Sequence, residues 1–155
     1  MLQRIQSIYL LAASLVMFAL FLFPVAHDVY INGKPSTIKV TGIYQDAGTA
    51  MHLVTPFTLL TIVTVVVAIV PLIVIFLFKD RKKQVTYSYI AVFVILAYTF
   101  WLSQTVKTAT GGFEMQTSNF GIGVILSSLS ILLLIMAAKA IGRDEKLVRS
   151  ADRLR

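Results

Sequence analysis

The chain has 155 residues, of which 57% are hydrophobic and only 14% are charged, and its formal net charge is +7. An ordinary soluble domain is closer to 45–50% apolar with about a quarter of its residues charged. This composition therefore excludes an ordinary soluble domain and predicts one integral membrane domain over residues 1–155. Because the chain has no cysteine, disulfides, thiol chemistry and cysteine-ligated metals are excluded as well.

The first predicted span covers residues 5–24 and is almost uninterrupted apolar sequence up to Pro24. At about 1.5 Å per residue, a helix of this length nearly crosses a hydrocarbon core of roughly 30 Å. A cleavable signal peptide is the rival interpretation. The apolar stretch is longer than an ordinary signal core, and cleavage after Ala26 would put Pro24 where a small residue is needed. We therefore expect a retained transmembrane helix.

The largest polar segment covers residues 25–52 and contains the dipeptide Asn32-Gly33, which is typical of tight hairpin turns. Beyond the turn, apolar and polar residues alternate with a period of two around Ile38 and Val40. This pattern predicts a small extracytoplasmic β-hairpin.

Three further apolar runs predict three more spans, and Gly142 stands where a glycine commonly ends a helix. The predicted spans cover about 53–78, 85–105 and 120–141, with polar segments at 79–84 and 106–119 and a charged tail at 142–155.

The basic residues predict the orientation of these spans. If both termini lie on the side of segment 79–84, that side holds 11 of the 14 lysines and arginines and four of the seven acidic residues, so it carries the whole net charge of +7. Cytoplasmic segments of membrane proteins are rich in lysine and arginine. We therefore expect both termini in the cytoplasm, and the same count explains the basic composition without nucleic-acid binding.

The tail is predicted to form a short amphipathic helix, because its apolar residues recur at helical spacing. Such a helix could lie on an anionic lipid surface or could bind a cytoplasmic partner protein, and periodicity does not separate the two. The predicted membrane-surface or partner face consists of Arg4, Lys79, Arg81, Lys82, Lys83, Arg143, Lys146, Arg149 and Arg153.

Small and hydroxyl residues within the spans have two interpretations. Thr58, Thr61 and Thr64 recur every three residues and could line a polar path, although threonine in a span more often bonds to a backbone carbonyl or a neighbouring helix. Gly123 and Ser127 form a small-xxx-small pair, which predicts close helix packing within the bundle or between molecules.

No pattern in the sequence predicts catalysis, a metal or a cofactor. His27 and His52, with Asp28 and Asp46 nearby, could ligate a metal only if the polar segment brought them together, and their spacing fits no compact ligand motif. No G-x-S-x-G motif occurs, and no ionisable residue lies at mid-depth in a predicted span, where such residues usually mark proton or ion pathways.

Both ends of the chain carry a likeness to a known family, in the segments MLQRIQSIYLL and DEKLVRSADRLR. With four spans and an outer segment after the first, the chain resembles the bacterial membrane family known as domain of unknown function 4293. The resemblance implies a multi-pass protein of the bacterial inner membrane, and it implies no catalytic residue.

The predicted fold is thus an all-α membrane bundle of four transmembrane helices with a small extracytoplasmic β-hairpin and a short amphipathic C-terminal helix. The function we expect is a non-catalytic accessory or scaffold subunit that is embedded in the lipid bilayer and binds a membrane-protein partner. A small transporter or channel that uses the threonines of the second span is the alternative.

Overall fold

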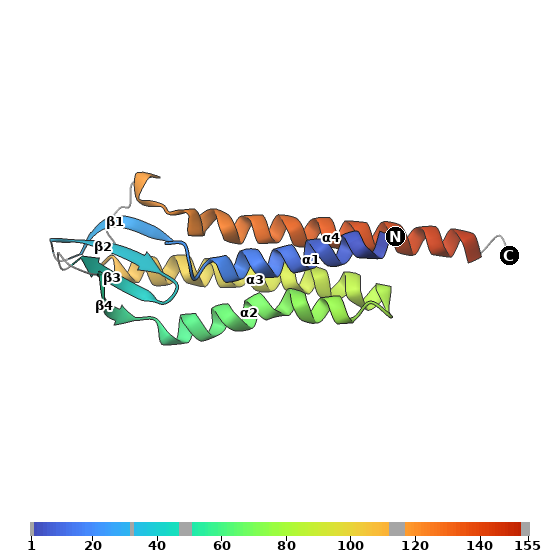
Figure 1. Cartoon of the computed structure of the whole chain (residues 1–155), viewed down its shortest axis with the longest axis horizontal. Helices are drawn as coiled ribbons and strands as arrows, with labels where there is room; N and C mark the ends of the chain where they lie inside the picture. The colour runs from blue at the N-terminus through green and yellow to red at the C-terminus, as the bar shows by residue number, and fades with distance from the viewer. Residues whose placement is uncertain (1, 32, 47–50, 112–116, 153–155) are drawn as a thin grey trace.

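The computed structural model describes residues 2–31, 33–46, 51–111 and 117–152. Within these ranges, four helices run along the long axis of the molecule, and a four-stranded antiparallel sheet lies at one end of them (Figure 1). Both termini and the connection between α2 and α3 lie at the opposite end (Figure 1). The chain is therefore mostly helical, as predicted, with its β structure confined to one end.

The first helix, α1, spans Leu2–Ala19 and is shorter than the predicted span. The amides of Leu20 and Phe21 bond to carbonyls only three residues earlier, at 3.2 and 3.1 Å, so the helix tightens and ends before Pro24. The chain then passes directly into the sheet.

The sheet is a meander in the order β1-β2-β3-β4. The predicted hairpin corresponds to its first two strands, and Gly33 has the positive φ of 76° that a tight turn requires. Asn32 lies outside the described residues. The strands are β1 (Ala26–Ile31), β2 (Lys34–Lys39), β3 (Gly42–Asp46) and β4 (Met51–Pro56).

The sheet is larger than the predicted hairpin, because β3 and β4 add two more strands. Gly42, with φ of 152°, allows β3 to start beside β4, because a Cβ there would collide with the carbonyl oxygen of Thr55. The second span is predicted to start at residue 53, but residues 53–56 belong to β4 (Met51–Pro56), and the helix begins only at Thr58.

The next two helices are α2 (Thr58–Phe76) and α3 (Arg81–Ala109). The basic segment between them turns the chain back at the end of the molecule that holds the termini (Figure 1). A one-turn 3₁₀ helix (Thr117–Asn119) precedes the last helix. Ala26 forms an isolated antiparallel bridge with Phe120, which ties the start of β1 to the start of the last helix.

The last helix, α4, spans Ile122–Asp152 and passes through Gly142. The predicted helix end at Ile141 and the separate tail helix are therefore wrong. Gly142 has no positive φ, and good helix formers such as Glu145 and Lys146 follow it. The last turns of α4 project beyond the ends of the other helices (Figure 1).

The helices bury one set of apolar side chains between them and expose many large apolar side chains along their length. Leu10, Ile95 and Leu134 are fully buried between the helices, whereas Phe93 and Ile125 are among many large side chains that remain exposed. Three helices of the described chain are long and apolar enough to cross a membrane: Thr58–Phe76, Arg81–Ala109 and Ile122–Val148. The apolar part of α1, Ile5–Ala19, is shorter.

Candidate functional site

The basic residues predicted to form a membrane-surface or partner face lie on elements that meet at the end opposite the sheet (Figure 1). Lys79, Lys82, Lys83, Arg143 and Lys146 are exposed, while Arg81 is half-buried. Arg4 lies in α1 and Arg149 in the last turns of α4, and Arg153 lies outside the described residues.

Asp80 caps α3 on this surface. Its side chain accepts a hydrogen bond from the Lys83 backbone N–H at 3.2 Å, as expected of an N-cap aspartate. This bond, together with the Lys83 ammonium 3.2 Å away, holds the pKa of Asp80 below its ordinary value. The helix start is therefore capped by a carboxylate at neutral pH.

An ion pair joins α3 to α4 beside this cap. Arg81 Nη1 lies 3.1 Å from Asp144 Oδ2 and also donates to the Asp144 carbonyl oxygen at 3.4 Å. Two amides add similar ties, since Gln84 donates to the Val74 carbonyl and Gln6 donates to the Ala140 carbonyl. These contacts fix the four helix ends relative to one another. Because Asp144 is held by Arg81, α4 keeps its direction where it extends beyond the bundle.

Beyond Asp144, the projecting part of α4 exposes an apolar pair. Leu147 is 60% exposed and Val148 is 45% exposed, and both lie near the exposed cations Arg143 and Lys146. Apolar side chains framed by cations therefore extend past the bundle on the basic end.

The three threonines predicted to line a polar path differ in their burial and in their hydrogen bonds. Thr64 is fully buried, donates to the Leu60 carbonyl at 2.6 Å and lies 2.8 Å from the Tyr98 hydroxyl of α3. Thr61 donates to the carbonyls of Phe57 and Val40, whereas Thr58 is exposed at the start of α2. Two of the three hydroxyls thus bond to backbone carbonyls, as the packing interpretation expects.

Gly123 and Ser127 are both buried, and Gly123 lies at a close contact within one molecule. The Gly123 N–H donates to the Pro24 carbonyl at 2.9 Å, and a Cβ at this position would lie 2.8 Å from the same oxygen. The glycine lets α4 approach the backbone that follows α1. One turn later Ser127 is fully buried, and its hydroxyl has no hydrogen-bond partner among the described residues.

Two other serines tie the helices together in the interior. The Ser14 hydroxyl of α1 donates to the Ala68 carbonyl of α2 at 2.7 Å, and the Ser130 hydroxyl of α4 donates to the Ala13 carbonyl of α1 at 3.0 Å. Such bonds between helices compensate for the burial of polar groups in an apolar interior.

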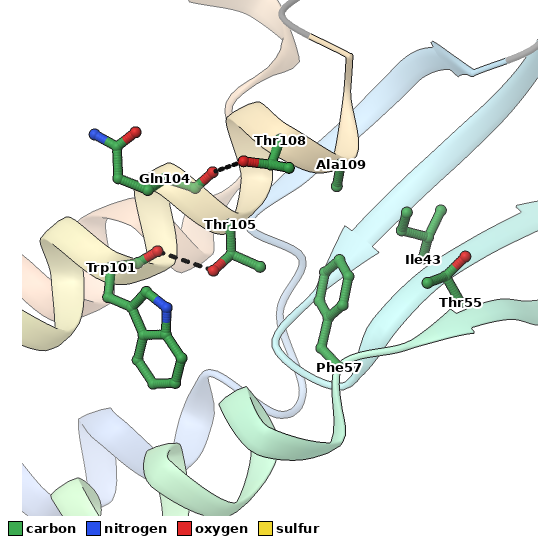
Figure 2. A pocket seen from close by; sticks show the side chains of 8 residues that line it. All are labelled: Ile43, Thr55, Phe57, Trp101, Gln104, Thr105, Thr108 and Ala109. Carbon is green, nitrogen blue, oxygen red and sulfur yellow. Dashed lines mark hydrogen bonds between the residues drawn. The ribbon is translucent and has the colours of Figure 1, made fainter.

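A cleft of about 440 Å³ lies between α3 and the β3–β4 side of the sheet. Figure 2 shows Trp101, Thr105 and Thr108 on α3, opposite Phe57 and Ile43. The hydroxyls of Thr105 and Thr108 donate to carbonyls four residues earlier, both at 3.0 Å (Figure 2). Among the described residues, the lining of the cleft consists of apolar, threonine and glutamine side chains, so its surface is weakly polar.

The histidines lie on the sheet and are not brought together as a ligand set. His27 Nδ1 lies 3.0 Å from the carboxylate of the adjacent Asp28, whereas His52 is exposed on β4. Across the part of the chain that the structure describes, no group of three His, Cys, Asp or Glu residues could hold a metal. The side chain of Asp46 is outside that part.

Three features were not predictable from the sequence patterns: the cleft, the Arg81–Asp144 pair, and the Ser127 hydroxyl that has no partner among the described residues. The cleft depends on Thr55 of β4, which lies in the predicted second span, and the ion pair depends on α4 continuing past Gly142. Glu145 and Lys146 after the glycine are good helix formers and were the available signal for that continuation.

Comparison with curated proteins gives no match for this chain. Comparison with protein families gives one that covers residues 2–154, nearly the whole chain. The terminal segments that suggested a resemblance both lie almost entirely within the match, so the expected relationship is confirmed. The chain belongs to the family described as domain of unknown function (DUF4293).

Proposed function

We propose that the protein is a non-catalytic accessory or scaffold subunit of a bacterial inner-membrane complex, and that it binds its partner at the basic end. In this proposal all four helices cross the bilayer, both termini and the α2–α3 connection face the cytoplasm, and the sheet lies on the opposite side.

The exposed surface of the helices supports membrane insertion. Large apolar side chains such as Phe93, Phe100 and Ile125 face outward, and lipid would provide a favourable environment for them. The positive-inside rule supports the orientation, because the exposed lysines of segment 79–84 lie at the same end as the termini.

The interior of the bundle supports a structural role. The buried hydroxyls of Ser14, Thr64 and Ser130 are hydrogen-bonded to groups within the molecule. The apolar stretches of the four helices contain no Asp, Glu, Lys, Arg or His that could carry protons or bind ions at mid-depth.

The observation that carries the proposal is the projecting end of α4. A separate amphipathic helix could rotate to lie on the lipid surface, but α4 is continuous with its membrane portion and is held by the Arg81–Asp144 pair. Leu147 and Val148 are therefore presented beyond the bundle, where a protein partner can cover them. Charge complementarity favours an acidic amphipathic helix on that partner.

Affinity purification in mild detergent, with the tag at the N-terminus, tests the proposal. A defined partner should copurify with the wild-type chain, and its recovery should fall at least tenfold in Leu147→Glu. The matched control is Met51→Glu, because Met51 is equally exposed at 60% but lies on β4 at the other end. Isolation of the wild-type chain alone, or full recovery of the partner with Leu147→Glu, would contradict the proposal.

A small transporter or channel is the second candidate, and the buried Thr64–Tyr98 hydroxyl pair between α2 and α3 is the observation in its favour. A polar path would also need Thr58 and Thr61, yet the Thr61 hydroxyl already bonds to two carbonyls. Solute flux into liposomes that is lost in Thr64→Val, while the variant remains folded, would favour transport over the accessory role.

A further inference from the structure

The buried hydroxyl of Ser127 on α4 requires a partner that the described residues do not supply. Ser127 is fully buried, and its oxygen is the one buried side-chain polar atom of the described chain without a hydrogen bond. Ser88 and Thr99 on α3 instead donate to carbonyls four residues earlier, at 2.8 and 2.7 Å. Nearly all buried polar groups in proteins are satisfied, because an unpaired one is costly. A group from outside the described chain should therefore meet this hydroxyl.

A pocket between α3 and α4, next to the sheet, provides the space for such a group. Its volume is about 110 Å³, and Ser127 is part of its wall. A water molecule occupies roughly 30 Å³, so the pocket has room for about three or four groups of that size. Most of the wall is apolar, and the lining includes Leu102, Val106, Phe120, Val124 and the cation Lys107.

The polar groups of the pocket lie at different depths. Lys107 is exposed near the sheet end of α3, and Thr99 lies eight residues, or roughly 12 Å, deeper along the same helix. Lysine near a helix end can extend its ammonium to the polar surface of a bilayer. The pocket thus offers a cation near the proposed membrane surface, a hydroxyl from α4, and apolar walls.

We propose that this pocket binds one anionic phospholipid from the leaflet on the sheet side. The headgroup phosphate pairs with Lys107, an ester carbonyl accepts a hydrogen bond from Ser127, and acyl methylenes contact Leu102, Val106 and Val124. Water alone would satisfy Ser127 but would leave the apolar walls and the cation without a role. The assignment rests on the membrane arrangement of the proposed function and is independent of any partner at the basic end.

Native mass spectrometry of the full-length chain, delipidated in detergent and then mixed with one lipid, tests the assignment. The wild-type protein should retain one molecule of phosphatidylglycerol and should bind zwitterionic phosphatidylcholine about tenfold more weakly. Lys107→Gln and Ser127→Ala should each weaken phosphatidylglycerol binding by about tenfold, the effect of losing one good hydrogen bond or ion pair. Lys34→Gln and Ser128→Ala are the matched controls, because both side chains are exposed outside the pocket, and they should bind as the wild type does.

Ser127→Ala removes an unpaired hydroxyl and should remain folded, so its result is interpretable. Val124→Phe fills the pocket without changing either polar group and should abolish retention. Equal retention of both lipids, or unchanged phosphatidylglycerol binding by Ser127→Ala or Val124→Phe, would overturn the proposal. Unchanged binding by Ser127→Ala would leave water as the partner of the hydroxyl. The two proposals can also fail separately. If no partner copurifies with the wild-type chain but phosphatidylglycerol still binds as expected, the scaffold role fails and the lipid site stands.

Discussion

Two glycines of α4 lie in opposite environments and respond to the same substitution in opposite ways. A Cβ on Gly123 would lie 2.8 Å from the Pro24 carbonyl oxygen and 3.1 Å from Val25 Cα, and these backbone atoms cannot move without shifting the chain after α1. A Cβ on Gly142 would meet nothing within 4 Å.

Gly123→Ala should therefore destabilise the fold by about 1–3 kcal/mol through overpacking. Gly142→Ala should stabilise it by about 0.5–1 kcal/mol, because alanine loses less backbone entropy in a helix. Unfolding of both variants in mixed micelles measures the difference. A Gly123→Ala protein as stable as the wild type would show that α4 does not contact the Pro24 backbone.

The Asp80 cap makes the start of α3 sensitive to acid. Because the pKa of Asp80 is lowered in the folded chain, its stabilising effect is present above the ordinary carboxyl pKa of about 3.9 and is lost as pH falls through the lowered value. Amide hydrogen exchange at Lys83 should accelerate in this acid range beyond its intrinsic pH dependence. Asp80→Asn keeps an N-cap acceptor and should remove that extra dependence; an unchanged profile in this variant would exclude Asp80 as its source.

At the scale of elements, the Arg81–Asp144 pair joins two helices, and its energy depends on its partial burial. The side chains are 27% and 11% exposed, compared with 67% and 47% for the Lys83–Asp80 pair on the surface. A double-mutant cycle with Arg81→Met and Asp144→Asn should give a coupling of about 1–2 kcal/mol. The exposed pair is the control and should give a much smaller coupling, because solvent screens it. Equal couplings would mean that the link between α3 and α4 contributes no more than a surface ion pair.

The elements also show what the sequence could predict. Long apolar runs predicted helices in the right places, and Gly33 marked a real turn, because both signals are local. The prediction of a helix over residues 53–56 is wrong because a short apolar run fits a strand equally well, and only pairing with β3 decides between the two. Gly142 failed as a stop signal because a glycine in a helix costs only about 1 kcal/mol relative to alanine, which the contacts of Asp144 and the following helix formers offset.

The candidate sites were predictable to a smaller extent. Segment 79–84 and the end of α4 lie at the same end of the molecule, as the order of the predicted spans requires (Figure 1). The surroundings of Ser127 and the cleft beside Trp101 arise from contacts between segments distant in the chain, and these contacts leave no pattern in the sequence.

At the scale of the whole molecule, the two ends differ in structure and charge. The sheet closes one end, and the start of α3 and the end of α4, which are rich in cations, lie with both termini at the other (Figure 1). The scaffold and lipid proposals both require this polarity to be maintained across a bilayer, with the basic end in the cytoplasm.

Cysteine labelling tests that arrangement most directly, because the chain has no cysteine of its own. Lys34→Cys places a thiol on β2, and Lys82→Cys places one at the start of α3; both positions are exposed. In spheroplasts, a membrane-impermeant maleimide should label Lys34→Cys at once and Lys82→Cys only after the membrane is permeabilised. Labelling of Lys82→Cys in intact spheroplasts, or protection of Lys34→Cys until permeabilisation, would contradict the account.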